Sequence, residues 1–246
     1  MTPDEARAGA GAGAPSGLVP RTAGAPAVPT PPFDRAWRGL YEVIYRGIES
    51  LARLLFRPLF RVRRVGLASP LPARGVLLCP NHQSYLDPAL VQLVVRRHLM
   101  FVMTNDFYAV PFARGFFRLV GAIPVARGRM AYRSMRRAAA LLRLGRTVVV
   151  FPEGRLSLDG SLHRFQRGIG LLARRGRAPV VPVAIDGSLQ AWPRGAHWLR
   201  RSDVRIALGP AIAHDGPPTR DGDQAFADGV AAAVAGLRAA LPRPRP

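Results

Sequence analysis

A histidine and an aspartate lie five residues apart in the stretch CPNHQSYLDP, which follows a short apolar run and covers residues 79–88. An imidazole titrates near neutral pH, so His82 can accept a proton from a hydroxyl group. The carboxylate of Asp87 can hold the other ring nitrogen and stabilise the imidazolium that forms. At a corner between a strand and a helix, this spacing lets the two side chains meet. The pair is therefore a candidate general base with its orienting acid.

A purely structural role for the aspartate is the alternative. The dipeptide Asp87-Pro88 is typical of a helix start, with the acid as N-cap and proline at the first helical position. The residues around His82 leave both interpretations open, so the elements that position them have to be considered.

Between residues 65 and 213 the chain alternates short apolar runs with helical patterns. The apolar, β-branched runs predict strands at 75–78, 99–103, 121–125, 147–151, 180–185 and 204–208. The segments between them predict helices at 88–97, 107–119, 131–144, 166–174 and 189–192. This alternation predicts an α/β fold with a mostly parallel central sheet flanked by helices. Ligands of such sheets gather in the loops at the carboxyl ends of the strands.

Unusual residues mark four of these predicted strands. Asn81 and His82 follow the first, Arg127 follows 121–125, Pro152-Glu153-Gly154-Arg155-Leu156-Ser157 follows 147–151, and Pro182 lies within 180–185. Each has a local alternative: a solvated arginine, an ordinary turn in which glycine supplies the positive φ, or a proline that indicates a sheet edge or a bulge. Their shared position at strand ends is the stronger argument, and it favours one site.

The charge balance predicts a polyanionic partner. The chain carries 36 basic and 15 acidic residues, a formal net charge of +21, and it contains no lysine. Arginine offers forked, permanently charged donors that suit phosphate. The single cysteine, Cys79, excludes a disulfide framework and a multi-cysteine metal site, and its apolar surroundings favour burial.

The N-terminal part of the chain differs in composition from the rest. Residues 1–33 are rich in Ala, Gly, Pro and Thr, which predicts a disordered tail. Residues 34–64 are predicted to hold an amphipathic helix over 36–57 and a basic segment that together lie on the membrane interface; packing of the helix on its own domain is the alternative. We expect no signal peptide and no transmembrane helix. The remaining chain is assigned to one domain at 65–241, with a last helix at about 224–241, and a frayed tail at 242–246.

In order and spacing, the motifs resemble those of the glycerolipid acyltransferase family, which includes lysophosphatidic acid acyltransferases. The family motifs are Asn-His-x4-Asp, Gly-x-(apolar)-x-x-x-Arg, Phe-Pro-Glu-Gly-Thr-Arg-Ser and an apolar-Pro-apolar strand. They are matched by Asn81-His82-x4-Asp87, by Gly121 to Arg127, by Phe151-Pro152-Glu153-Gly154 and by Val181-Pro182-Val183. The chain departs from the third motif at Arg155, which stands where threonine is usual, and Ser157 offers a hydroxyl nearby.

The resemblance implies acyl transfer from a thioester on coenzyme A or acyl carrier protein to the free hydroxyl of 1-acylglycerol 3-phosphate, giving phosphatidic acid. His82 would be the general base, Asp87 would orient it, and Arg127 and Arg155 would clamp the phosphate. Glu153 would position an arginine or a glycerol hydroxyl. The other expected substrate-binding residues are Asn81, Gly154, Ser157 and Pro182. The reaction implies no cofactor and no metal, and the expected place is the cytoplasmic face of the cell membrane, peripheral or monotopic, on anionic lipids.

Three alternatives remain open at this point. The acceptor can be another lysophospholipid or an ornithine-type lipid. From a different class, the chain can be a non-catalytic basic protein that binds membrane or nucleic acid. The intact motif Asn81-His82-x4-Asp87 argues against a non-catalytic protein that only binds membrane. The lack of any helix-turn-helix, RNP or zinc pattern argues against nucleic-acid binding. The five histidines are scattered, with no spacing typical of zinc ligands.

Overall fold

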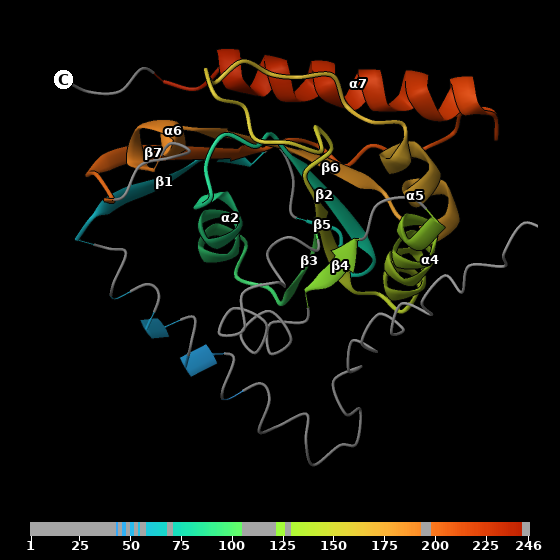
Figure 1. Ribbon diagram of the computed structural model, residues 1–246, viewed down its shortest axis with the longest axis horizontal. Helices are drawn as coiled ribbons and strands as arrows, with labels where there is room; N and C mark the ends of the chain where they lie inside the picture. Colours follow the sequence, from blue (N-terminus) through green and yellow to red (C-terminus); the bar gives the residue numbers. More distant parts are fainter. Residues whose placement is uncertain are drawn as a thin grey trace, which may run out of the picture.

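Seven strands form a single sheet in the order β1-β7-β6-β2-β5-β3-β4 (Figure 1). This computed structural model describes residues 43, 46–47, 50–51, 54, 58–67, 71–104, 122–125, 129–192 and 198–242. The strands are β1 (Phe60–Leu67), β2 (Val76–Pro80), β3 (Leu99–Thr104), β4 (Ile123–Val125), β5 (Thr147–Val150), β6 (Val180–Asp186) and β7 (Ser202–Leu208). All neighbouring pairs are parallel except β6 and β7. The predicted α/β fold with a mostly parallel sheet is therefore confirmed.

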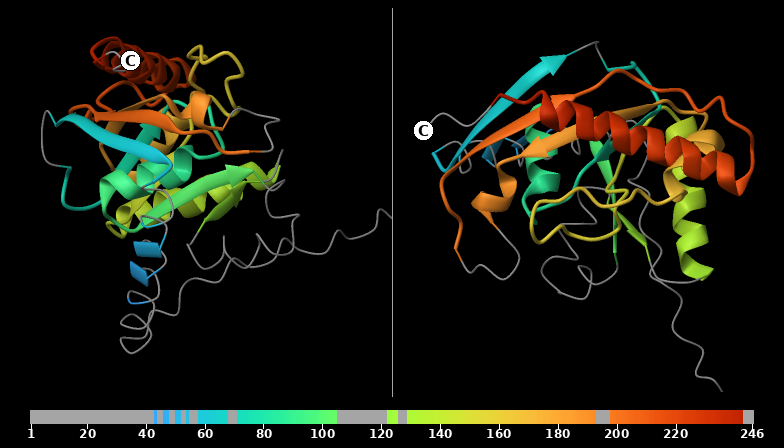
Figure 2. Two further views of the ribbon diagram at one scale, coloured as in Figure 1. Left: turned by 90° about the vertical axis from the view of Figure 1, so that its left-hand side faces the viewer. Right: turned by 90° about the horizontal axis from the view of Figure 1, so that it is seen from above.

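Helices cover both faces of this sheet and enclose two apolar clusters. On one face, α2 (Asp87–Val95) and α6 (Ser188–Ala191) pack on Leu78, Val149 and Val183 among others. On the other face lie α4 (Arg129–Arg143), α5 (Gly168–Gly176) and the long α7 (Arg220–Ala239). Figure 2 shows α7 running across the sheet on this second face. Its start is fixed by Thr219, whose side chain accepts a hydrogen bond from the backbone N–H of Gly222.

The predicted helices agree with α2, α4, α5, α6 and α7 in type and approximate bounds. The predicted helix at 107–119 lies outside the described residues, as does the tail at 1–33. Of the predicted helix at 36–57, the described residues (43, 46, 47, 50, 51 and 54) are helical and exposed. Within the part of the chain that the structure describes, no helix combines the length and apolar character needed to cross a membrane.

The strand β1 was not predicted from the sequence. Its arginines at 61, 63 and 64 were assigned to a basic segment next to the membrane helix, yet Phe60–Leu67 forms the edge of the sheet and pairs in parallel with β7. Phe60 is buried and Val62 packs beside it, while the arginines between and after them are exposed. The sheet therefore begins five residues before the boundary placed at 65.

Pro182 lies in an interior strand, so the expectation of an edge is wrong, whereas a shift of the pairing register beside Pro182 agrees with the expected bulge. On one side β6 pairs with β2, where Pro182 faces Cys79; on the other side the ladder with β7 begins one residue later, at Val183. The carbonyl of Pro182 accepts from the N–H of Gly209. Beyond Pro182, Val180 pairs with Ile212, so two residues of β6 lie opposite three residues of the partner segment. The carbonyl and nitrogen of one strand residue point to the same side, so the missing donor of Pro182 faces this bulge.

The strand directions bring several segments to one edge of the sheet. The parallel strands β2, β5 and β6 all end there, and His82 and Glu153 follow two of them. Because β7 is antiparallel to β6, β7 begins at this same edge, and β1 begins beside it. We call this the carboxyl edge.

Candidate active site

The imidazole of His82 and the carboxylate of Asp87 meet at the carboxyl edge. His82 Nδ1 and Asp87 Oδ2 are 2.9 Å apart. The aspartate side chain is fully buried, whereas 16% of the histidine side chain is exposed. A carboxylate can only accept a hydrogen bond, so Nδ1 carries the proton that is donated to Asp87. In the neutral ring, the lone pair therefore lies on Nε2. In the described part of the chain Nε2 has no partner, so it is available to a substrate.

The acid acts on the loop before it, not on the helix after it. The residue at the N-cap position of α2 is Leu86, and Asp87 is the first residue of the helix. Its Oδ2 atom accepts hydrogen bonds from the backbone N–H groups of Gln83 (2.7 Å) and Ser84 (2.8 Å). The N-cap interpretation of Asp87 is therefore wrong: the carboxylate closes the 82–87 turn around the imidazole.

The loop that carries the histidine is fixed to the end of β6. The amide of Asn81 makes two hydrogen bonds with the backbone of Ile185, at 2.7 and 2.9 Å, and Gln83 Nε2 donates to the same carbonyl at 3.0 Å. Asn81 is buried, with both ends of its amide engaged. It extends the sheet beyond the last residue of β2 and sets the height at which His82 leaves it.

A second loop, which follows β5, holds the histidine from the other side. The ring of Phe151 stacks on the His82 ring, with the ring centroids 4.0 Å apart and the planes inclined by 25°. The backbone N–H of Ser157 donates to the His82 carbonyl at 2.8 Å. The imidazole is thus held at its edge by Asp87 and on its face by Phe151.

Glu153 joins the two loops through backbone contacts. Its Oε1 atom accepts from the N–H of His82 at 2.8 Å, and its Oε2 atom accepts from the N–H of His163 at 3.1 Å. Burial raises the pKa of the Glu153 carboxyl, while these two hydrogen bonds pull the pKa down by less. Among the described residues, Glu153 therefore contacts backbone N–H groups and no arginine, and its contact with a glycerol hydroxyl stays a prediction.

Arg155 is an exposed cation of the second loop. Its Nη2 atom lies 3.4 Å from His163 Nδ1, and the residue is otherwise open to solvent. Ser157 is buried and its hydroxyl donates to Asp159 at 3.0 Å, so this hydroxyl fastens the loop. His163 was passed over in the sequence because it carries no motif. Only its place ten residues after Glu153, on the same loop, could have pointed to it.

The remaining predicted site residues have different positions. Gly154 adopts a φ of +69°, and a Cβ added there would meet only Gln166 at an ordinary contact distance of 3.9 Å. The turn therefore requires glycine for its backbone conformation and not because space is short. Pro182 is buried on the face covered by α7, against Gly209. Arg127 lies outside the described residues. Substrate contact by these residues stays a prediction.

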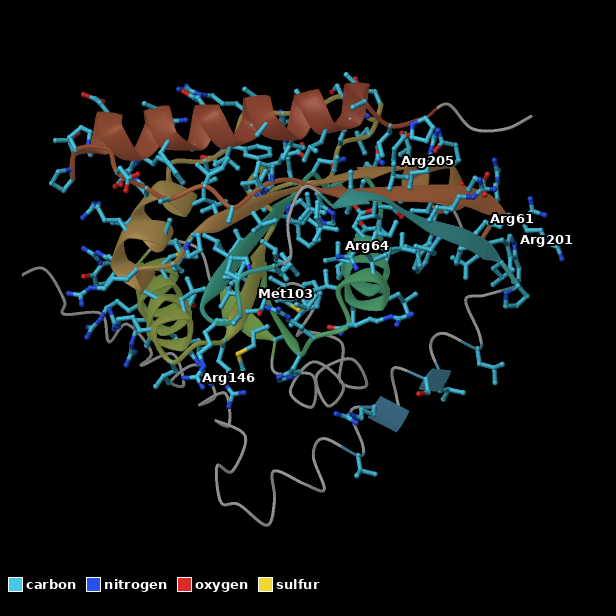
Figure 3. The ribbon with its side chains drawn as sticks, turned by 180° about the vertical axis from the view of Figure 1, so that it is seen from behind. Arg61, Arg64, Met103, Arg146, Arg201 and Arg205 are labelled. Atoms are coloured by element: carbon cyan, nitrogen blue, oxygen red, sulfur yellow. The ribbon has the colours of Figure 1, made fainter. Side chains whose placement is uncertain are left out.

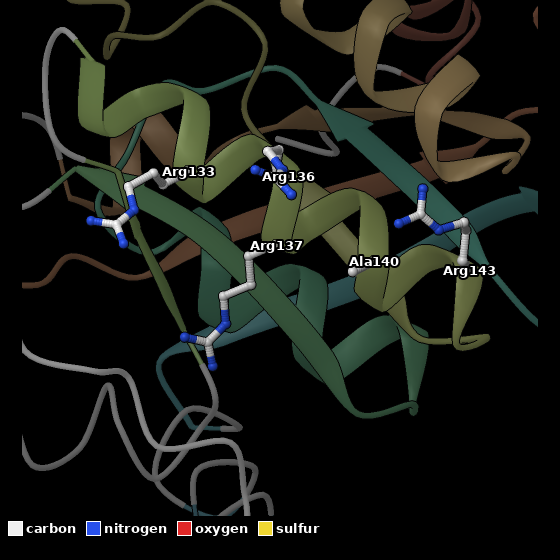
Figure 4. Close-up of a pocket in the computed structure, with 5 residues that line it drawn as sticks. All are labelled: Arg133, Arg136, Arg137, Ala140 and Arg143. Carbon is white, nitrogen blue, oxygen red and sulfur yellow. The ribbon is translucent and has the colours of Figure 1, made fainter.

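A separate hollow of about 330 Å³ lies on α4 (Figure 4). Arg133, Arg136, Arg137, Ala140 and Arg143 line it, and none of the residues around His82 takes part. In the described ranges, no group of three or more His, Cys, Asp or Glu side chains is placed to hold a metal ion.

Comparison with known proteins points to one family. A model of the family described as Acyltransferase matches residues 57–186, more than half of the chain. A chloroplastic 1-acyl-sn-glycerol-3-phosphate acyltransferase of Brassica napus is 28% identical over 180 residues, which cover 72% of this chain and 51% of that protein. A 1-acyl-sn-glycerol-3-phosphate acyltransferase of Chlamydomonas reinhardtii is 30% identical over 172 residues, covering 68% of this chain and 50% of the relative.

A solved structure has the same fold. The crystal structure of the 1-acyl-sn-glycerophosphate acyltransferase PlsC from Thermotoga maritima superposes with a TM-score of 0.70 over 86% of each chain, at 23% sequence identity. The chain spans about half the length of the two plant and algal relatives. The matched part includes His82, Asp87 and the loop after β5.

Proposed function

The chain belongs to the acyltransferase family, and from that premise we propose that it moves a fatty acyl group from an acyl thioester to the free hydroxyl of 1-acylglycerol 3-phosphate. The product would be phosphatidic acid, made for phospholipid biosynthesis. One observation carries the proposal: His82 Nδ1 is held by a buried carboxylate at 2.9 Å, while no residue that the structure describes binds Nε2. That is the arrangement which general-base activation of a hydroxyl requires.

The proposed step is a direct transfer. His82 Nε2 accepts the hydroxyl proton while the acceptor oxygen attacks the thioester carbonyl carbon. The carbon–sulfur bond then breaks, and the imidazolium returns the proton to the leaving sulfur, which departs as the thiol of coenzyme A or of acyl carrier protein. Asp87 stabilises the imidazolium between the two proton transfers. General-base assistance of this kind contributes roughly 10²–10⁴ in rate.

Arg155 is the described candidate for holding the phosphate. It lies on the loop that Glu153 and Ser157 fasten to His82, so a phosphate bound there is tied to the position of the base. A guanidinium suits phosphate because it is permanently charged and forked. Arg127 is proposed as its companion from the sequence motif alone.

We place the enzyme on the membrane surface that contains its acceptor, on the cytoplasmic face. Val43, Leu51 and Leu54 are helical and more than half exposed, which suits an interfacial helix better than one packed on the domain. Replacing Leu51 and Leu54 by glutamate should release the protein from anionic vesicles. A double variant that remains fully bound would return this helix to the alternative, packing on its own domain.

Product analysis separates the acceptors. Purified protein is incubated with a panel of 1-acylglycerol 3-phosphate, other lysophospholipids and lyso-ornithine lipid, with acyl-CoA or acyl carrier protein as donor, and products are identified by mass spectrometry. The proposal expects phosphatidic acid to form fastest. Faster acylation of another lysolipid would identify that lysolipid as the acceptor in place of 1-acylglycerol 3-phosphate. If no pair of donor and acceptor gave an acylated product, the alternative of a non-catalytic basic protein would be favoured.

A further inference from the structure

An exposed cluster of aromatic and basic side chains lies at the start of β7. Trp198 is 83% exposed and Leu199 is 38% exposed, and Arg200 and Arg201 follow them on the surface. Arg61 of β1 joins them, because β1 and β7 pair in register from Phe60 and Ser202 onward. Figure 3 shows Arg61 and Arg201 at one end of the sheet, pointing away from the body of the protein. We call these five residues the basic rim.

Local acids do not neutralise the rim. Asp203 lies 3.8 Å from Arg63, and Asp186 is paired with Arg205, so the two acids nearest in the sheet are engaged by other arginines. Within the described residues, no ion pair involves Arg61, Arg200 or Arg201. An exposed tryptophan among uncompensated arginines is costly in water but suits the boundary between lipid headgroups and acyl chains.

The rim is fastened to the loop that carries His82. The backbone N–H of Arg200 donates to the carbonyl of Ala191 at 2.9 Å, at the end of α6. The next residue, Trp192, accepts through its own carbonyl from the hydroxyl of Ser84 at 2.8 Å. Ser84 in turn donates its backbone N–H to Asp87. The chain of contacts therefore leads from the rim to the catalytic pair in three steps.

Strand direction places both on the same side of the molecule. The rim stands where β1 and β7 begin, and His82 stands where β2 ends, which is the carboxyl edge in each case. A bilayer that met the rim would therefore lie along the edge from which His82 Nε2 is reached.

We propose that the basic rim is a docking surface for anionic lipid bilayers, separate from the N-terminal helix, and that it presents the His82 edge to an acceptor embedded in the membrane. The part of this inference that concerns the acceptor rests on the proposed function. The docking itself does not. Arginines bind the anionic headgroups, and Trp198 and Leu199 enter the interface between them.

Vesicle binding by the full chain tests the docking without any substrate. The rim variant combines Trp198→Ser with Arg201→Glu. Its control combines Leu144→Ser with Arg220→Glu, which removes an equally exposed apolar side chain and changes the net charge by the same amount elsewhere on the surface. Both variants should retain the wild-type circular dichroism and melting temperature, because all four side chains are exposed.

The rim variant should bind vesicles of equal parts phosphatidylglycerol and phosphatidylcholine at least about tenfold more weakly than wild type, since each basic residue near an anionic surface contributes about fivefold. The control should bind as wild type does. In addition, brominated lipid should quench wild-type tryptophan fluorescence more than that of Trp198→Phe. Equal vesicle affinity of rim variant and wild type overturns the inference, and so does a wild type that binds single-stranded oligonucleotide but not vesicles.

Activity assays distinguish this inference from the proposed function. The rim variant should acylate a short-chain, water-dispersed lysophosphatidic acid at the wild-type rate but lose at least about tenfold with the long-chain acceptor in vesicles. Equal losses with both acceptors would contradict a docking role. A wild type that binds vesicles through the rim and transfers no acyl group would support the docking surface and remove the proposed reaction.

Discussion

The ring of His82 lies on the ring of Phe151, with centroids 4.0 Å apart and planes 25° from parallel. The two residues come from different strands, since His82 follows β2 and Phe151 follows β5, and those strands are neighbours in the sheet. The hydrogen bond to Asp87 fixes the position of Nδ1. The Phe151 ring packs on the face of the imidazole and limits how far the imidazole can tilt about this hydrogen bond. The stack therefore sets the direction in which Nε2 points.

We predict that Phe151→Ala lowers kcat about tenfold or more with little change in the acceptor KM, because a misdirected base loses transition-state contacts and not ground-state binding. Phe151→Tyr, which keeps the ring, should restore most of the rate. Steady-state kinetics of the two variants make the comparison. If kcat fell equally in both variants and the melting temperature fell with it, Phe151 would only fill space in the fold.

Asp87→Asn should lower kcat by roughly 10²–10⁴, because a neutral amide cannot stabilise the imidazolium. The asparagine oxygen can still accept from the Gln83 and Ser84 N–H groups, so the melting temperature should change little. Asp87→Ala leaves both donors without an acceptor and should destabilise the fold by about 1–3 kcal/mol for each. If Asp87→Asn kept a kcat close to that of the wild type, the Asp87 carboxylate would hold the 82–87 turn and would not stabilise the imidazolium.

Arg155→Ala should weaken use of the phosphorylated acceptor by about ten- to a hundredfold in kcat/KM, the effect of losing one charge-assisted contact. The donor KM should stay unchanged, and so should the lower rate with unphosphorylated 1-acylglycerol. Arg164→Ala is the matched control, because Arg164 is an exposed arginine on the same loop. If the phosphorylated and unphosphorylated acceptors lose equally, Arg155 does not bind the phosphate.

Glu153→Gln should destabilise the protein, because one amide oxygen can replace only one of the two acceptors that hold His82 and His163. The raised pKa of Glu153 adds a pH dependence. In the wild type, the stability that protonation of Glu153 contributes to the folded state is fully present below the ordinary glutamate pKa of 4.5. It is lost as the pH rises through the raised pKa of Glu153. Urea unfolding at several pH values should show the advantage of the wild type narrowing as pH rises. If the wild type gained stability over Glu153→Gln as the pH rose, the pKa of Glu153 would be lowered and not raised by folding.

Strand and helix types followed from the sequence because apolar runs and helical periods are local properties. The strand β1 was missed because Arg61, Arg63 and Arg64 interrupt its apolar residues, and because its pairing with β7 is a contact between residues about 140 positions apart in the chain. Tertiary pairing therefore makes a strand of residues whose local pattern indicated only a basic segment.

The contact between His82 and Asp87 could be predicted from their spacing, but the contacts of their neighbours could not. Whether Glu153 meets an arginine, a ligand or a backbone N–H depends on which loop lies opposite, and that is set by the order of β2 and β5 in the sheet. Asn81 likewise contacts Ile185, 104 residues away in the chain. Residue type at a strand end indicated the candidate site, and only the fold could show which of its residues are open to solvent and which hold the loops together.

The most direct test of the account is the rate of phosphatidic acid formation by the His82→Ala variant, measured by mass spectrometry with saturating acyl thioester and 1-acylglycerol 3-phosphate. The side chain is partly exposed and contacts Asp87 and Phe151 only through its ring, so the variant should fold and bind vesicles as the wild type does. We predict a loss of roughly 10²–10⁴ in kcat, the contribution of a general base. A folded His82→Ala protein that forms phosphatidic acid at the wild-type rate would contradict the assignment of His82 as that base.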